Sequence, residues 1–236
     1  AIIYDQEREA GDQILNIENL SVSNNGVFLF KNVHLNLAKG DKVIIYAKDT
    51  RAISALYAIL MGERKADSGS FDWGITTSQA YLPLDHDVFF ETPMNLVDWL
   101  RQYAKTEEER EEVFLRGFLG KMLFSGEEAL KMSNVLSGGE KVRCMLSKMM
   151  MERANVLLLE EPTNHLDLES ITAFNNSLNN FKGTLLFSTS DHAFAQTIGT
   201  RIIELTPKGV IDRHATFDEY MTCLLYTSPS PRDSSE

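Results

Sequence analysis

The sequence predicts an α/β fold with a mostly parallel core sheet. Short apolar runs of buried-strand length, such as VLLL at 156–159, alternate with segments of helical periodicity. A chain of 236 residues that is 43% hydrophobic and 24% charged is long enough for one domain with a full core. A helical block between about 95 and 136 separates the first strands from the later ones, which predicts an inserted helical subdomain.

The first half is predicted to begin with an antiparallel β subdomain, since its apolar runs are short and bounded by turn residues. Alternation along the second run places Phe28 and Phe30 in the core. The expected elements, in order, are short strands within 14–46 with a turn at 24–26, the last of them a buried strand at 41–46; a helix over 51–61 that ends at Gly62; a turn at 67–69; and two strands within 70–83.

The second half predicts the alternation of helix and strand that builds a parallel sheet. Acidic residues between 107 and 112 indicate a solvated helix face. The expected elements are a helical pattern from 95 to about 134, a helix from 137 to about 153, a strand at 156–159, a helix at 168–180, a strand at 184–187, and a hairpin within 201–213 that turns at 207–209.

Composition excludes several classes of protein. The formal net charge of −11 argues against a large nucleic-acid surface, so we expect no direct DNA binding by this domain. The apolar runs are far too short to span a membrane, and the first residues have no signal-peptide pattern. Two cysteines provide no disulfide framework, which fits a cytoplasmic location.

The C-terminal residues have an unusual composition. The string CLLYTSPSPRD at 223–233 looks like the in-frame translation of a sequencing adapter. We therefore predict that residues 223–236 form a non-native, disordered tail, and we leave them out of functional reasoning.

Two motifs about twenty residues apart carry the chemistry. In LSGGE at 136–140, Ser137 and Glu140 have capping-box spacing, and the glycines between them let a helix N-terminus approach an anion closely. In EEPTNHLD at 160–167, two carboxylates directly follow a predicted buried strand. Together these stretches resemble the signature motif and the Walker B/D-loop of an ATP-binding cassette (ABC) domain. EPTNHLD in particular is typical of the ABC-F class, ATPases without a membrane domain that act on the ribosome.

The resemblance implies a role for each motif residue. Glu160 stands at the Mg²⁺-side Walker B position with one methylene more than the usual aspartate, and Glu161 matches the general base that polarises the attacking water. His165 belongs to the D-loop and is expected to be structural. The residues that would be offered to the ATP of a partner cassette are Ser137, Gly138, Gly139 and Glu140 of the signature and Asn164, His165, Leu166 and Asp167 of the D-loop.

The phosphate loop that should accompany these motifs is degenerate. A Walker A loop, G-x-x-x-x-G-K-[ST], wraps phosphates with backbone N–H groups and a lysine. Here its eight positions hold Ala47, Lys48, Asp49, Thr50, Arg51, Ala52, Ile53 and Ser54. Losing the lysine costs roughly 1.5–3 kcal/mol, and forcing an L-residue into a left-handed loop position costs roughly 1–2 kcal/mol. We expect phosphate binding to be weaker by about two to three orders of magnitude.

Other positions that would serve the chain's own nucleotide also depart from the family pattern. Leu84 replaces the Q-loop glutamine, with Gln79 too early to substitute, and Ser190 replaces the switch histidine, with His192 expected on the surface. Ser54 and Glu160 remain as weak candidate Mg²⁺ ligands.

The pattern of loss and retention predicts a mechanism. ABC domains work as head-to-tail pairs, and each ATP lies between the Walker motifs of one cassette and the signature and D-loop of the other. We therefore predict the second cassette of a two-cassette ABC-F ATPase, with residues 1–13 as the end of a linker, 14–222 as the cassette and about 95–150 as its helical subdomain. The resemblance implies ATP and Mg²⁺ as cofactors, and an N-terminal cassette and the ribosome as partners. The alternatives are a nucleotide-binding subunit of a membrane transporter and a non-catalytic regulatory cassette.

Overall fold

The computed structural model describes residues 2–213 of the chain. The predicted tail at 223–236 lies outside this part. Within it, no helix is long and apolar enough to cross a membrane.

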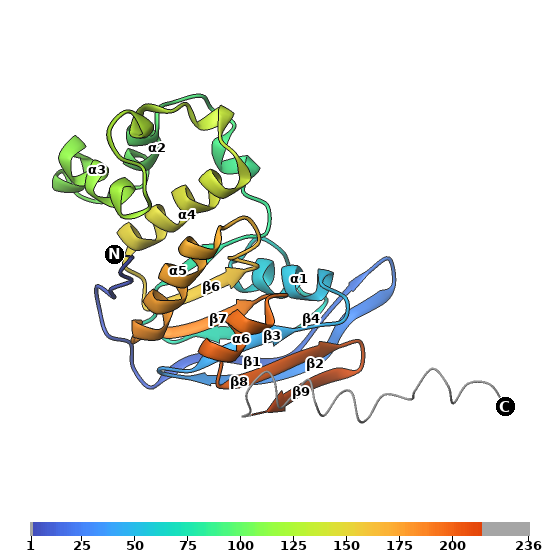
Figure 1. Ribbon diagram of the computed structural model, residues 1–236. Helices are drawn as coiled ribbons and strands as arrows, with labels where there is room; N and C mark the ends of the chain where they lie inside the picture. Colours follow the sequence, from blue (N-terminus) through green and yellow to red (C-terminus); the bar gives the residue numbers. More distant parts are fainter. Residues whose placement is uncertain (1, 214–236) are drawn as a thin grey trace.

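Two sheets form the lower body of the molecule (Figure 1). The first is antiparallel, in the order β2-β1-β4. The second has the order β5-β6-β7-β3-β8-β9 and is parallel except for the last pair. The strands are β1 Gln13–Asn24, β2 Val27–Ala38, β3 Lys42–Tyr46, β4 Ser68–Trp73, β5 Gln79–Leu82, β6 Val156–Glu160, β7 Thr184–Ser188, β8 Arg201–Thr206 and β9 Gly209–Arg213. This confirms the predicted α/β class with its antiparallel first part.

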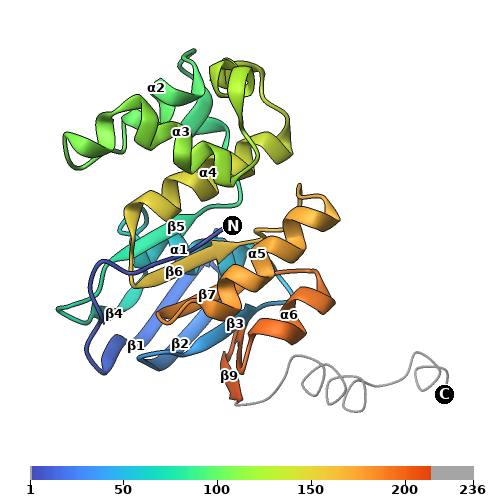
Figure 2. The same cartoon turned by 60° about the vertical axis from the view of Figure 1, so that its left-hand side comes forward.

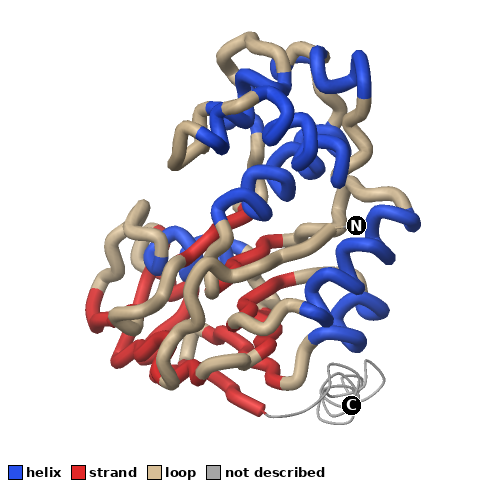
Figure 3. Tube along the Cα trace, turned by 90° about the vertical axis from the view of Figure 1, so that its left-hand side faces the viewer, coloured by secondary structure: helices blue, strands red, loops and turns tan. Residues whose placement is uncertain are grey.

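The helices fall into two groups, and Figure 3 shows one of them standing off the sheets as a separate mass. That mass is the helical subdomain inserted between β5 and β6. The α-helices are α1 Arg51–Leu60, α2 Leu96–Arg101, α3 Glu112–Lys121, α4 Gly138–Glu152, α5 Leu168–Asn180 and α6 His192–Ile198. The subdomain also contains short 3₁₀ turns, η1 Asp87–Phe90, η2 Glu108–Arg110, η3 Gly126–Leu130 and η4 Ser133–Val135.

The core sheet is buried on both faces, and its strands show why the runs are apolar throughout. In β3, Val43 and Ile45 join the cluster that includes α1, whereas Ile44 joins the cluster that includes α4 and α5. In β6, Leu158 joins the cluster that includes α1, and Leu157 joins the cluster that includes α4 and α5. Since successive strand residues point to opposite faces, a strand covered on both sides needs an apolar residue at every position.

The predicted helical pattern from 95 to about 134 is wrong as a continuous element. Asn95 caps α2 by accepting from the N–H of Asp98, but α2 ends after six residues. After α3, Leu123 adopts φ 70° and Gly126 φ 57°, so the chain reverses twice before α4. The helical periodicity of the sequence correctly indicates which side chains are buried in the subdomain, but it does not show where one short helix ends and the next begins.

Two local predictions in the first half are also wrong. Phe28 is 36% exposed, with the Lys31 ammonium 5.0 Å from its ring centre, whereas Phe30 is fully buried as expected. Irregular pairing between β1 and β2 breaks the alternation at this point. The predicted turn at 67–69 is too long, because β4 begins at Ser68. Gly69 lies inside the strand at φ +87°, where a Cβ would stand 2.2 Å from the carbonyl oxygen of Asn19.

Candidate nucleotide-binding site

The segment predicted as the phosphate loop connects β3 to α1, and the backbone N–H groups of its last residues are bonded within the loop. The N–H of Ala52 donates to the Asp49 carbonyl (3.0 Å), and those of Ile53 and Ser54 donate to the Thr50 carbonyl (3.1 and 3.3 Å). No residue from 47 to 54 has a positive φ. The loop therefore avoids the left-handed backbone conformation, and the strain expected for an L-residue in that conformation does not arise. Its last residues begin α1 with an ordinary helical turn.

The charged side chains of this loop pair with one another. The Arg51 guanidinium donates to both carboxylate oxygens of Asp49, with an Nη2–Oδ2 distance of 2.7 Å. The Arg51 hydrogen bond holds the pKa of Asp49 below its usual value. Lys48 is exposed and forms no ion pair with another described residue. Either Lys48 or Arg51 could supply charge in place of the missing lysine, but Arg51 is already paired with Asp49.

Glu160, at the end of β6, is 4% exposed and bonded through both carboxylate oxygens. Ser54 Oγ donates to Oε2, and Tyr81 Oη donates to Oε1 at 3.3 Å. Burial raises the pKa of Glu160, and the neighbouring charge of Glu161 adds to the rise, while the hydrogen bonds from Ser54 and Tyr81 and the nearby backbone of Leu84 oppose it.

Glu161 follows directly and is held by the switch position. Its Oε2 accepts from the backbone N–H of Ser190 at 3.0 Å and from the Ser190 hydroxyl at 3.3 Å. Glu161 adopts φ 48°, and its own N–H donates to the Ser188 carbonyl at 2.9 Å. The backbone after β7 thus binds the carboxylate predicted to be the general base.

The signature motif begins α4 in a full capping box. Ser137 Oγ accepts from the N–H of Glu140 (3.2 Å), and the Glu140 carboxylate accepts from the N–H of Ser137 (3.1 Å). Lys131 pairs with Glu140 at 2.7 Å and, by this hydrogen bond, lowers the pKa of Glu140. The N–H groups of Gly138 and Gly139 have no hydrogen-bond partner among the described residues. This helix N-terminus keeps two free donors for an anion.

The D-loop packs directly on the signature glycines of the same chain. A Cβ on Gly138 would stand 3.2 Å from the imidazole of His165, and one on Gly139 would stand 2.6 Å from the His165 carbonyl oxygen. Asp167 ends the loop as the N-cap of α5, accepting from the N–H of Ser170 at 2.8 Å. The glycines therefore have a structural reason as well as the predicted functional one.

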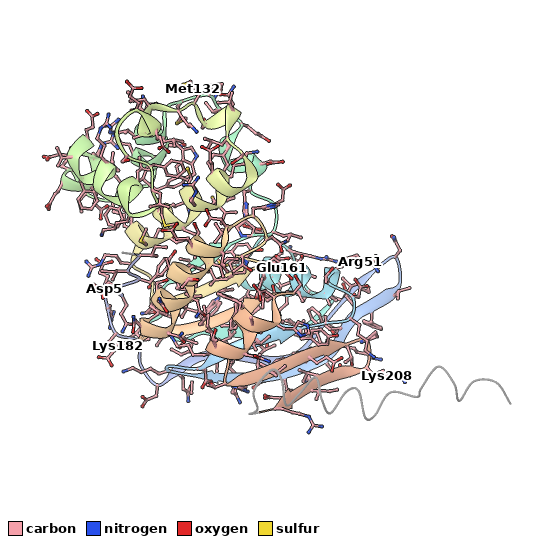
Figure 4. All side chains as sticks on the ribbon, in the orientation of Figure 1. Asp5, Arg51, Met132, Glu161, Lys182 and Lys208 are labelled. Carbon is pink, nitrogen blue, oxygen red and sulfur yellow. The ribbon has the colours of Figure 1, made fainter. Side chains whose placement is uncertain are left out.

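The predicted residues form two groups, one at the edge of the core sheet and one where the D-loop contacts the start of α4. Figure 4 shows Glu161 and Arg51 near the same edge of the core, with Met132 far above them on the helical subdomain. At this edge one hydrogen bond joins Ser54 to Glu160, and others join Ser190 to Glu161, the next residue in the chain. The Leu84 side chain, at the Q-loop position, is 50% exposed.

Two contributors were missed by the sequence reasoning. Tyr81 binds Glu160, and Lys141 in the first turns of α4 pairs with Asp87 at 2.7 Å, which ties the signature helix to the segment after the Q-loop position. Neither residue has a motif spacing that could have identified it.

The residues of the own site do not fit Mg-ATP as they stand. Three of the loop's N–H donors are satisfied by carbonyls, and the hydroxyl of Ser54 is bonded to the carboxylate that would share the metal. Both carboxylate oxygens of Glu160 are already bonded, one to Ser54 and the other to Tyr81. The signature end of α4 is different, because its donors are free.

Comparisons of the sequence and of the fold with known proteins both indicate an ATP-binding cassette domain. The family described as ABC transporter matches residues 30–164 of the chain. The fold is similar to that of the ATP-binding cassette MJ0796, solved as a dimer in a post-hydrolysis state with ADP and Pi. That similarity has a TM-score of 0.70 at 18% identity, over 85% of this chain and 98% of that one.

Two curated relatives are similar over most of this chain. One is the uncharacterized ABC transporter ATP-binding protein YkpA of Bacillus subtilis, 53% identical over 92% of this chain. The other is the energy-dependent translational throttle protein EttA of Haemophilus influenzae, 30% identical over 89%. The chain spans only 40% of the length of YkpA and 38% of that of EttA.

Proposed function

The chain belongs to the ABC transporter family of ATP-binding cassette domains, and on that premise we propose that it completes the ATP site of a second cassette while its own site is weak or inactive. The signature residues Ser137, Gly138 and Gly139 would contact the γ-phosphate held by the partner, and the D-loop would lie beside it. ATP and Mg²⁺ would be bound by the partner's Walker motifs.

One observation carries this proposal, namely the opposite state of two helix N-termini. At α1 the backbone N–H groups of Ala52, Ile53 and Ser54 donate to the chain's own carbonyls. At α4 those of Gly138 and Gly139 have no acceptor among residues 2–213, and the capping box holds the helix end in place around them. A helix N-terminus with free donors attracts an anion, and one with occupied donors does so far less.

We assign the intact protein to the ABC-F class of ATPases, with ATP turnover coupled to translation on the ribosome and a cytoplasmic location. The EPTNHLD string and the similarity to EttA, a translational throttle protein, support this assignment. The chain's net charge of −11 means that basic elements outside it would make the contacts with ribosomal RNA.

The first alternative, a nucleotide-binding subunit of a membrane transporter, needs a docking cleft around residues 85–93. In this segment Phe90 stacks on Trp99 with ring centres 4.8 Å apart, and the Trp99 indole donates to the Phe89 carbonyl at 2.7 Å. Ser133 donates to the Thr92 carbonyl at 2.8 Å. These contacts anchor Phe89, Phe90 and Thr92 to the subdomain, but Val88 is 64% exposed, so the preference for ABC-F rests on the EPTNHLD string rather than on this segment.

The second alternative is a purely regulatory cassette without any catalytic contribution. Random decay would erode the signature as readily as the phosphate loop, yet LSGGE retains its full capping box. The retention of one motif beside the loss of the other favours a contribution in trans.

Calorimetric titration of the chain with Mg-ATP tests the own-site half of the proposal. We expect a dissociation constant in the millimolar range or weaker, and micromolar affinity would contradict an inactive site. The trans half is tested in the two-cassette protein by Ser137→Ala, which should lower ATP turnover without changing the ATP affinity of the other cassette's Walker motifs. Unchanged turnover would contradict the trans role.

The ribosomal part needs its own measurement. The two-cassette protein carrying glutamine at the general-base position of the other cassette should trap ATP and co-sediment with ribosomes. Sedimentation with membranes instead would favour the transporter alternative.

A further inference from the structure

Residues 2–12 have no regular secondary structure, yet they are bound along the body of the molecule. We call this segment the N-terminal strap. Ile2, Tyr4 and Ala10 are buried, with exposed fractions of 9%, 6% and 7%. Figure 2 shows the strap entering the space between α4 on one side and α5 and β6 on the other. A flexible linker would not bury its side chains in this way.

Tyr4 touches both helices between which the strap runs. Its ring meets Phe174 of α5 edge-to-face, with centroids 6.1 Å apart and an interplanar angle of 78°. Its hydroxyl donates to the Leu146 carbonyl of α4 at 3.4 Å. Since the hydrogen bond is long, the buried ring contributes most of the contact.

The strap is also anchored by its backbone at three successive points. The N–H of Glu7 donates to the carbonyl of Arg153, the C-cap of α4, at 2.8 Å. The carbonyl of Arg8 accepts from the side-chain amide of Asn155 at 3.1 Å, and the N–H of Gly11 donates to Thr76 Oγ1 at 2.8 Å. These bonds hold the strap at the C-terminal end of α4 and before β6. They thereby fix the position of Tyr4 between α4 and α5.

The surface between the helical subdomain and α5 is hollowed beside the strap. A partly open pocket of about 160 Å³ lies there, and its lining includes Ile2, Met122, Leu123, Arg143, Ser170 and Ala173. Direct packing between the subdomain and α5 is therefore interrupted at this place. Tyr4 joins the two helices beside this pocket through its contacts with Leu146 and Phe174.

The two helices joined by Tyr4 begin at the two elements that the chain would offer to a partner. α4 starts at Gly138 after the signature cap, and α5 starts at Leu168 after the D-loop. Any rotation of α4 relative to α5 changes the distance between the free N–H groups of Gly138 and Gly139 and the D-loop.

We propose that Tyr4 is a positioning residue that fixes the helical subdomain against α5 and thereby sets the geometry of the signature and D-loop. The functional consequence rests on the proposed trans role, but the positioning itself does not.

Spin-label distance measurements by double electron–electron resonance test the proposal on the whole chain. Labels at Glu127→Cys in the helical subdomain and Asn179→Cys at the end of α5 are both on exposed positions. Cys223 is replaced by serine, and Cys144 stays, because burial raises the pKa of its thiol and keeps it unreactive. We expect Tyr4→Ala to broaden the distance distribution about twofold, since it removes the buried aromatic contact.

Two further variants separate positioning from simple stability. Tyr4→Phe keeps the ring and should restore the narrow distribution, and Ile3→Ala changes a strap side chain that is 55% exposed and should leave it unchanged. If Tyr4→Ala does not fold, Phe174→Leu removes the same contact from the α5 side and should broaden the distribution. An unchanged distribution in a folded Tyr4→Ala variant, even with a lower free energy of unfolding, would overturn the proposal.

The outcome is independent of the ATP titration. A chain that binds Mg-ATP tightly would contradict the proposed function but leave the positioning intact, whereas an unchanged distance distribution would remove the positioning alone.

Discussion

The N-termini of α1 and α4 are the two places where this chain could meet a triphosphate, and they differ in almost every physical respect. At α1 the backbone donors are closed by the chain's own carbonyls, and Arg51 is paired with Asp49. At α4 a capping box holds the helix end while the N–H groups of two glycines remain free. The N–H donors at the start of α1 are satisfied without a ligand, whereas those at the start of α4 are free to bind an anion.

This difference shows how a nucleotide site can lose its own ligand without losing the fold. Replacing the motif glycines by Ala47 and Ala52 lets the loop adopt ordinary helical backbone, which costs nothing in strain and uses the donors internally. Gly139 of the signature cannot be lost as easily, because a Cβ there would meet the backbone oxygen of His165. Tertiary contact preserves one motif and leaves the other free to change.

The largest expected effect comes from restoring the phosphate loop. The triple variant Ala47→Gly, Ala52→Gly, Ile53→Lys should bind Mg-ATP about two to three orders of magnitude more tightly, since it returns both the lysine contact and the freedom of the loop to turn its N–H groups outward. Isothermal titration calorimetry measures the gain.

The matched control combines Ala47→Gly and Ala52→Gly with Ile53→Met. It restores the conformational freedom of the loop without the positive charge, so the difference between the two variants measures the contribution of the lysine. If the triple variant binds no better than the unchanged chain, the closed state of Glu160 rather than the loop limits binding.

The next effect compares the two signature glycines. Gly139→Ala should lower the free energy of unfolding by about 2 kcal/mol, because its methyl group meets a backbone oxygen 2.6 Å away that cannot move aside. Gly138→Ala meets the His165 ring at 3.2 Å and gains helix propensity, so it should be close to neutral. Urea unfolding of both variants checks the order, and a more destabilising Gly138→Ala would show that the D-loop packs differently.

A smaller effect should come from Glu160→Gln, and it should depend on pH. Because burial raises the pKa of Glu160 in the folded state, the ionised carboxylate weakens the fold, and stability falls as pH rises through that folded-state pKa. The neutral amide should therefore stabilise the chain at pH 7, by about 1 kcal/mol.

The gain should shrink as pH falls towards the ordinary value of 4.5, because there the folded wild-type carboxyl, with its raised pKa, is mostly protonated and the unfolded one is half protonated. Urea unfolding at pH 7 and pH 4.5 measures the difference, with Glu161→Gln as the control that leaves Glu160 ionisable. A gain that is equal at both pH values would contradict the assignment.

The smallest effect is expected at the switch position. Ser190→Ala removes only the 3.3 Å hydroxyl contact to Glu161, while the backbone N–H of the residue still donates to the carboxylate. The free energy of unfolding should change by no more than about 0.5 kcal/mol. A larger loss in thermal or urea unfolding would mean that the hydroxyl, rather than the backbone, holds Glu161.

Sequence reasoning succeeded where the signal is local or strongly periodic. The continuous apolar run of β6 predicts a strand buried on both faces, and the S-x-x-E spacing of Ser137 and Glu140 predicts a capping box that the structure contains. The adjacency of Glu160 to Glu161 places both carboxylates at the end of one strand. Each of these follows from the 2- and 3.6-residue periods of the backbone, which a linear pattern records faithfully.

Tertiary structure alone decided the features that join distant segments. The bond from Tyr81 to Glu160 depends on the pairing of β5 with β6, and the contact of His165 with Gly138 depends on the D-loop folding back on α4. The strap's position depends on its contacts with α4, α5 and Asn155. The closed state of the phosphate loop belongs here too. The residue pattern shows that a lysine and two glycines are absent, but only the folded backbone determines which acceptors the remaining N–H groups find.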